Sequence, residues 1–280
     1  MVCKKVILLC LPLLIPACAG KPISFIEKPQ PSQKYYTFSV LLTPEYPARS
    51  PRLEVGLSLY QMKYPPAQAA FVNQTLYSSV DPDSYKDRVV REQRENYRRS
   101  LSYPEDIGSE NPGNLKGVEI ADWKTFNWHY KEEFVPTGPG HRGIVIERTR
   151  ETYMGGAHGM LTKRYFVIDL EAQKLLKIND FINNYQGDQM RNLIYDELRR
   201  YSDLRKNQPL SDGIFFIDNP ELTFNFFIDE KGLGLHWDPY EIAPYSEGSI
   251  QIILPWRRVR PLLLNSGMEL LVKFNINLLV

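Results

Sequence analysis

Four histidines are the residues of this chain best suited to acid–base or metal chemistry, because imidazole titrates near neutral pH and is a common metal ligand. His158 lies in the glycine-rich sequence YMGGAHG (residues 153–159), and His236 lies two residues before Asp238. With Asp238 or Glu241, the two histidines can in principle assemble a hydrolytic site across a sheet. A zinc site ordinarily shows two or three ligands at helical or turn spacing, and the sequence has no such pattern.

Other arrangements give weaker indications of catalysis. His129 lies in an aromatic strand, where a packed or surface side chain is ordinary, and His141 lies in a Gly/Pro turn that we expect to be solvated. No G-x-S-x-G elbow or phosphate-binding loop is present. Glu132 and Glu133 are adjacent, so a strand directs them to opposite faces and they do not form a glycosidase pair. We therefore assign no catalytic residue, no metal and no cofactor, and of the two classes we favour a protein that is not an enzyme.

The glycine-rich turn also has a purely structural interpretation. Gly155 and Gly156 permit positive φ at a tight reversal, and Gly159 allows close approach of the backbone. A histidine at this place can hydrogen-bond a neighbouring carbonyl group and fix the turn. We favour this role for His158 over that of a catalytic base.

The first residues resemble an export signal. Lys4 and Lys5 precede the apolar sequence VILLCLPLLIPA, which ends at Cys18 in the sequence IPAC. This ending resembles a bacterial lipobox, in which the cysteine is lipidated and becomes the mature N-terminus. We predict a signal peptide over residues 1–17, a lipid on Cys18 and a tether over residues 18–34. The alternative is an ordinary secretory signal with an incidental cysteine.

Composition limits the remaining classes. All three cysteines lie within the first 18 residues, so the body after the leader has no thiol for a disulfide or a nucleophile. The formal net charge is +1, which gives no indication of nucleic-acid binding. The later sequence has no apolar run long enough to suggest a second membrane segment. We expect an exported globular body held to a membrane by its N-terminus.

Aromatic and β-branched runs predict about ten strands, and three helices interrupt them. This order favours an α+β fold in which helices pack on mainly antiparallel sheets. We divide the body into an N-terminal domain over residues 35–150 and a C-terminal domain over residues 151–280. The predicted strands cover residues 35–43, 52–62, 123–135, 143–154, 163–170, 221–229, 232–237, 249–256 and 267–280; the predicted helices cover residues 66–80, 83–101 and 187–204.

Two motifs in the second half carry a family resemblance. The first is TYMGGAHG followed by FVIDLEAQKLLKINDFI, and the second is YEIAPYSEG (residues 240–248) followed by a strand that ends in Pro-Trp. Over residues 153–264 the chain resembles the extracytoplasmic domain of RsiV-type anti-sigma factors, also found ahead of the catalytic domain of the peptidoglycan deacetylase PdaC. A looser match over residues 35–127 suggests the partner domain that usually precedes it.

In RsiV-type proteins this region binds lysozyme, so the resemblance implies a non-catalytic binding or sensing module. The present chain shows no sigma-binding segment and no deacetylase domain, so transmembrane signalling is not implied. We expect a lipoprotein of the bacterial cell envelope, periplasmic or surface-facing, with a lysozyme-like protein or peptidoglycan as ligand. An envelope hydrolase that uses His158 and His236, and a structural or assembly lipoprotein, stay as alternatives. The candidate binding residues are Tyr153, Gly155, Gly156, His158, His236, Trp237, Tyr240, Glu241 and Tyr245.

Overall fold

The computed structural model describes residues 30–48, 50–78, 81–100, 127–138 and 142–278. The predicted signal peptide, Cys18, most of the predicted tether and His141 lie outside these ranges. The described residues form an α+β protein with two sheets, which confirms the predicted fold class. None of the helices in the described ranges is long and apolar enough to cross a membrane.

The first sheet has six strands in the order of the sequence, β1-β2-β3-β4-β5-β6. All neighbouring strands are antiparallel except β2 and β3, which run parallel because two helices connect them. The strands are β1 (Gln30–Leu41), β2 (Arg52–Tyr64), β3 (Trp128–Pro136), β4 (Gly143–Tyr153), β5 (Met160–Asp169) and β6 (Lys174–Leu175).

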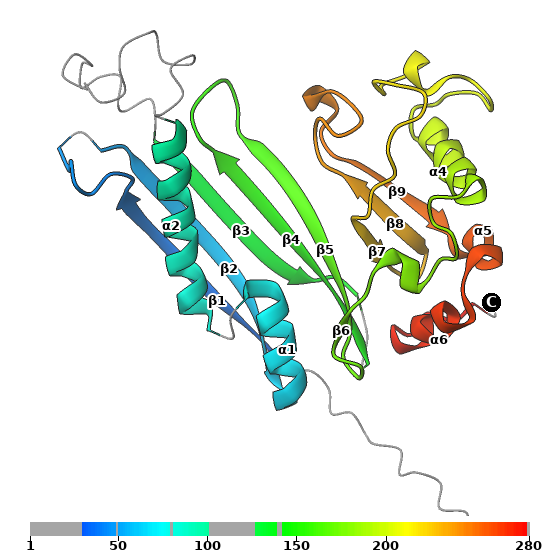
Figure 1. Cartoon of the computed structure of the whole chain (residues 1–280), viewed down its shortest axis with the longest axis horizontal. Coiled ribbons are helices and arrows are strands. Elements are labelled where there is room, and N and C mark those ends of the chain that lie inside the picture. Colours follow the sequence, from blue (N-terminus) through cyan, green and yellow to red (C-terminus); the bar gives the residue numbers. More distant parts are fainter. Residues whose placement is uncertain (1–29, 49, 79–80, 101–126, 139–141, 279–280) are drawn as a thin grey trace, which may run out of the picture.

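Helices α1 (Pro66–Tyr77) and α2 (Pro82–Ser100) lie across one face of this sheet (Figure 1). Alternate residues of the strands and every third or fourth residue of α2 meet in a buried core, which is the arrangement that both periodicities predict. This first core includes Leu53, Val55, Leu57, Leu59, Val72, Tyr77, Tyr85, Val89, Tyr97, Phe134, Ile146 and Ile168. The opposite face of β1–β3 is polar and exposed.

The second sheet is antiparallel, with the strand order β7-β8-β9. Its strands are β7 (Phe226–Ile228), β8 (Gly232–Trp237) and β9 (Ile250–Pro255), and its helices are α4 (Asp188–Tyr201), α5 (Trp256–Val259) and α6 (Asn265–Lys273). Short 3-10 helices cover Ile178–Asp180, Leu210–Asp212, Tyr245–Glu247 and Arg260–Leu262. The apolar stripe of α4 packs on this sheet and forms the second core, so the amphipathic pattern of residues 187–204 correctly predicted a helix.

Strands β4 and β5 contribute to both cores because their side chains alternate between the two faces of the sheet. Ile146 and Ile168 face the first core, whereas Val145 and Val167 face the second. The β4–β5 hairpin therefore lies between the helices of the first half and the sheet of the second. The predicted division after residue 150 falls inside β4, and the two-domain description stays a prediction.

Three predicted elements differ from the structure. Residues 267–280 were predicted as a strand, but α6 occupies Asn265–Lys273: Gly267, Leu271 and Phe274 are buried at helical spacing, whereas Val272 is exposed. The predicted strand 221–229 is paired only over Phe226–Ile228. β1 begins at Gln30, so the sheet includes residues 30–34 of the predicted tether.

Candidate functional site

The turn between β4 and β5 uses its glycines as the sequence predicted. Gly155 and Gly156 have φ values of 85° and 94°, in the region that favours glycine. A Cβ atom on Gly159 would lie 2.8 Å from the carbonyl oxygen of Thr152, so this position requires close approach of the backbone. The Tyr153 hydroxyl donates a hydrogen bond to the Gly156 carbonyl oxygen at 3.1 Å and closes the turn.

His158 is exposed, and both of its ring nitrogens have partners. Nδ1 lies 3.0 Å from the carbonyl oxygen of Gly159, so Nδ1–H is the donor. Nε2 is then an acceptor, and the hydroxyl of Tyr240 lies 3.4 Å from it. The turn hypothesis expected one ring nitrogen to be tied to the backbone, and the contact with Gly159 provides it.

The second motif lies directly against the first. The ring of Tyr245 stacks on the ring of His158 with a centroid separation of 3.8 Å, and its hydroxyl donates to the Gly159 carbonyl oxygen at 2.8 Å. Tyr240 has a φ of 72° and its backbone N–H donates to the Ala243 carbonyl oxygen, which fixes the loop that presents its ring. The exposed residues His158 and Tyr240 and the partly buried residues Tyr153 and Tyr245 are here called the motif surface.

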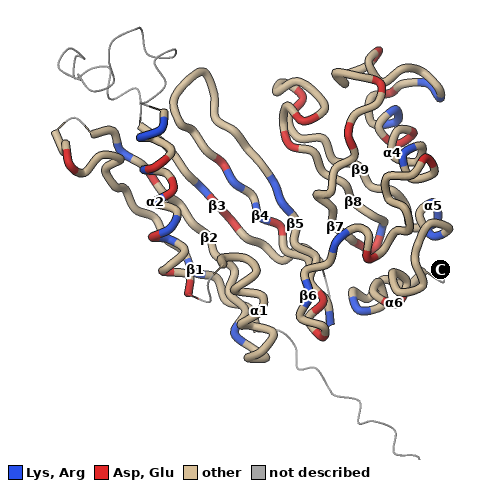
Figure 2. The backbone as a smooth tube through the Cα atoms, viewed as in Figure 1, with Lys and Arg blue, Asp and Glu red and all other residues tan. Residues whose placement is uncertain are grey.

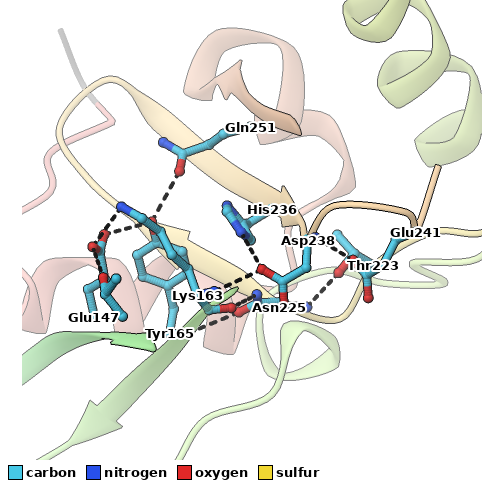
Figure 3. Close-up of polar contacts among 10 residues, drawn as sticks. Glu147, Lys163, Tyr165, Thr223, Asn225, His236, Asp238, Glu241 and Gln251 are labelled. Atoms are coloured by element: carbon cyan, nitrogen blue, oxygen red, sulfur yellow. Dashed lines mark hydrogen bonds and ion pairs between the residues drawn. The ribbon is translucent and has the colours of Figure 1, made fainter. Parts of the chain in front are cut away.

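His236 occupies a different environment from His158. Its side chain is 1% exposed and lies on β8, with Nε2 3.0 Å from Asp238 Oδ1 (Figure 3). The same carboxylate oxygen accepts the backbone N–H of Lys163 on β5 at 2.8 Å. Asp238 therefore links the end of β8 to β5. Within the described residues, no hydrogen bond or ring contact joins His158 to His236.

Two further candidate residues form hydrogen bonds that support the loop. Trp237 is 2% exposed and its indole N–H donates to the Glu221 carbonyl oxygen at 3.1 Å, so its ring is not part of the motif surface. Glu241 accepts the backbone N–H of Asp238 at 2.7 Å. Burial raises the pKa of Glu241, and the neighbouring charge of Asp238 adds to this effect.

A polar cluster between the two sheets had no signal in the sequence (Figure 3). Glu147 on β4 accepts hydrogen bonds from Lys163 and Tyr165 of β5, each at 2.8 Å, and the Tyr165 hydroxyl also lies 3.1 Å from Gln251 on β9. Asn225, just before β7, is bound to β5 by its side-chain amide, which donates to the Lys163 carbonyl oxygen at 2.7 Å and accepts the Tyr165 N–H at 3.0 Å.

The remaining sequence candidates form no hydrogen bond or ion pair with these groups within the described residues. His129 is exposed and pairs with Glu54 at 3.1 Å, while Glu132 is buried and Glu133 exposed, as their alternation predicted. Among the described residues, no three His, Cys, Asp or Glu side chains are grouped so that they would hold a metal ion. The geometry thus brings the two motifs together as one aromatic surface and does not bring the two histidines together as one catalytic pair.

Comparison with known proteins gives a family match that includes the second motif but not the first. Residues 179–257 match the family model described as "Protein of unknown function (DUF3298)". A DUF3298 family member from Bacteroides fragilis has a similar structure, with a TM-score of 0.68 at 17% identity over 85% of this chain and 94% of the other. A DUF3298 family protein from Pseudomonas aeruginosa PAO1 aligns with a TM-score of 0.51 at 14% identity over 85% and 96% of the two chains.

No curated protein has a sequence that matches this chain. At these identities the two solved structures support the fold alone. The chain therefore carries a DUF3298 match over residues 179–257, within an α+β fold similar to those of two DUF3298 proteins.

Proposed function

We propose that this protein is a lipid-anchored, non-catalytic binding module of the bacterial cell envelope, and that the motif surface contacts its ligand. The main support is the packing of the two motifs: Tyr245 stacks on His158, and Tyr240 is held beside them with half of its surface exposed. Tyrosine rings fixed in this way supply large contact area at low entropic cost. Proton transfer by His158 would disturb the contacts that hold the turn, which argues against a catalytic role.

A groove of about 770 Å³ on the exposed face of the first sheet extends the same surface. His129 lines this groove, and its ring centroid lies 6.1 Å from that of Tyr153 in the motif surface. The groove is lined by the hydroxyl groups of Ser58 and Thr149 and by several carboxylates, including that of Glu133. Together, the groove and the motif surface form an extended face that suits a macromolecular ligand.

The ligand we favour is a lysozyme-like protein, because the two motifs resemble those of a lysozyme-binding domain. Peptidoglycan is the second candidate, since the hydroxyl and carboxylate groups of the groove can hydrogen-bond a sugar chain while tyrosine rings contact the faces of the sugars. The chain from Ala19 onward, which retains every described residue, should be titrated separately with lysozyme and with purified muropeptides. Absence of binding to both would leave only the structural or assembly role.

A pair of variants tests whether the motif surface is the contact. Tyr240→Ala removes an exposed ring and should weaken ligand binding by about 10–30-fold, as expected for a central aromatic contact. Tyr201→Ala is the matched control, because Tyr201 is exposed to a similar degree, 45% against 50%, but lies on α4. Equal affinities of the two variants would place the ligand elsewhere.

The proposed anchor has its own test. Cells that express the chain should incorporate a labelled fatty acid into the wild-type protein and into Cys10→Ala, but not into Cys18→Ala. Membrane fractionation should show the same pattern, because stable attachment requires the lipid. Labelling that survives in Cys18→Ala would contradict the lipoprotein assignment without affecting the binding proposal.

A further inference from the structure

A second groove, of about 710 Å³, lies between the outer edge of β1 and helix α2. Phe38, Val40 and Val90 supply its apolar lining. Lys86 and Arg94 lie four residues before and after Val90, so these three side chains follow one side of the helix. This groove shares residues 35–38 of β1 with the first groove, but none of the four residues of the motif surface lines it.

Helix α2 is fixed to β1 at both ends of this groove. The hydroxyl of Tyr36 donates to Asp83 Oδ1 at 2.8 Å near the start of the helix. Farther along, Arg94 Nε donates to the carbonyl oxygen of Leu41 at 3.0 Å. Between these two contacts, residues 37–40 form no hydrogen bond to the described part of α2. These two contacts therefore fix α2 relative to β1 at the two ends of the groove.

The outer edge of β1 is available for pairing. β1 pairs with β2, and within the described ranges no strand pairs with its other edge. On an edge strand, every second residue directs its N–H and C=O groups away from the sheet. Natural edges are commonly protected by proline or charge, and here Pro31 and Lys34 occupy only the beginning of the strand. Residues 35–41, YYTFSVL, contain neither.

Side chains along this edge are incompletely covered. Tyr35 is 75% exposed, and Thr37 is also exposed on the same face of the strand. On the other face, Tyr36, Phe38 and Val40 pack against the first core but stay partly exposed. An added strand would cover both rows, with its alternate side chains entering the groove beside α2.

Charge indicates the chemistry of that strand. Lys86, Arg91 and Arg94 line the groove together with one acidic residue, Asp87. Lys86 also lies 4.0 Å from Asp83 Oδ1, and further acidic residues lie elsewhere on α2 (Figure 2). Arg91 is exposed and forms no ion pair with the described residues. We propose that the outer edge of β1 binds an extended acidic peptide segment of a partner protein by β-strand addition, with acidic side chains directed at Lys86 and Arg91.

A second copy of this chain is a poorer occupant of the same edge. If two β1 edges paired about a two-fold axis, both α2 helices would lie on the same face of the joined sheet, with their basic grooves facing each other. The like charges of Lys86, Arg91 and Arg94 from two copies would then repel. An acidic segment instead reduces the positive charge of the groove.

Two labelled peptide pools test the proposal on the chain from Ala19 onward. Each peptide has eight residues, in which valine, isoleucine or threonine alternates with glutamate in one pool and with lysine in the other. Fluorescence anisotropy should show binding of the glutamate pool and at least about tenfold weaker binding of the lysine pool. Methylation of every backbone nitrogen of the peptide should abolish binding, because such peptides cannot donate to β1 from either edge.

The variant Lys86→Glu/Arg91→Glu should weaken binding of the glutamate pool by at least about tenfold. Arg99→Glu makes a charge change on the same helix away from the groove and should leave binding unchanged. Unchanged affinity of the double variant, equal binding of the methylated peptides or no binding of the glutamate pool would each overturn the proposal. A concentration-dependent dimer in sedimentation that competes with the peptides would assign the edge to a second copy instead.

Discussion

The rings of His158 and Tyr245 are stacked, with their centroids 3.8 Å apart and their planes inclined by 18°. This contact joins the β4–β5 turn to the loop after β8, and the Tyr245 hydroxyl adds a hydrogen bond to the carbonyl oxygen of Gly159. The two motifs thus hold each other in place, and each exposes an aromatic residue beside the contact.

Two substitutions at Tyr245 should measure the contributions of the hydrogen bond and of the ring stacking separately. Tyr245→Phe removes only the hydroxyl and should lower the free energy of unfolding by about 0.5–1.5 kcal/mol, the usual range for one hydrogen bond. Tyr245→Ala also removes the stacking and should cost about 0.5–1.5 kcal/mol more. Urea denaturation measures both values, and equal stabilities of the two variants would contradict a role for the stacked ring.

Substitution of Glu132 should lower the free energy of unfolding more than substitution at most other positions of the first sheet. Its side chain is 0% exposed, and its carboxylate lies 2.9 Å from Arg150 Nη2 and 3.6 Å from Arg148 Nε, while Tyr85 donates to its other oxygen. Burial raises the pKa of Tyr85, and the charge of Glu132 raises it further. Glu132→Ala leaves two arginines without their shared counter-charge and should cost about 3–5 kcal/mol.

The adjacent residue provides the matched control for this prediction. Glu133 lies on the exposed face of the same strand, 3.4 Å from the Ser58 hydroxyl. Glu133→Ala should therefore change the free energy of unfolding by no more than about 0.5 kcal/mol. Thermal and urea denaturation of both variants should show a large difference, and similar losses would be inconsistent with the buried charge cluster.

Glu147 should make stability depend on pH. Burial raises the pKa of this carboxyl, but hydrogen bonds from Lys163 and Tyr165 outweigh burial and hold the pKa below its ordinary value of 4.5. Because the folded pKa is the lower one, the contribution to stability is complete above the unfolded pKa and is lost as pH falls through the folded pKa. In Glu147→Gln this part of the acid destabilisation should disappear.

The measurement is urea denaturation of both proteins at a series of pH values between neutrality and the acid limit of folding. The difference in the free energy of unfolding between wild type and Glu147→Gln should be largest near neutral pH. It should shrink below about pH 4.5, where the carboxyl becomes protonated first in the unfolded chain. A constant difference across the series would exclude Glu147 as a source of the pH dependence.

Asn225 should be required for the attachment of the second sheet to β5. Its side-chain amide donates to the Lys163 carbonyl oxygen and accepts the Tyr165 backbone N–H, as the backbone of a neighbouring strand would. Asn225→Ala should cost about 1–3 kcal/mol because it leaves both backbone groups without these partners. Asn225→Asp retains the acceptor but not the donor and should fall between wild type and alanine; equal stability of all three proteins would show that the bridge has no energetic role.

Much of the architecture was predictable from local patterns. The apolar stripe of residues 187–204 specified α4, and the strand-like runs 143–154 and 163–170 around the glycine-rich reversal specified the β4–β5 hairpin. Glycines at positions 155 and 156 indicated positive φ because other residues rarely adopt it. These features depend on neighbours in sequence, so the sequence by itself determined them.

Other features depended on which surfaces meet. Residues 267–280 have an ambiguous apolar pattern, and α6 forms because Leu271 and Phe274 enter the second core on one helical face. The stacking of His158 on Tyr245 and the hydrogen bonds of the Glu147 cluster join strands and loops that are distant in sequence. The burial of His236 beside Asp238 also depends on this packing. The sequence determined that the chain has a histidine in a glycine turn; only the tertiary structure decided that an aromatic loop packs on it, because no spacing rule relates segments that meet through packing.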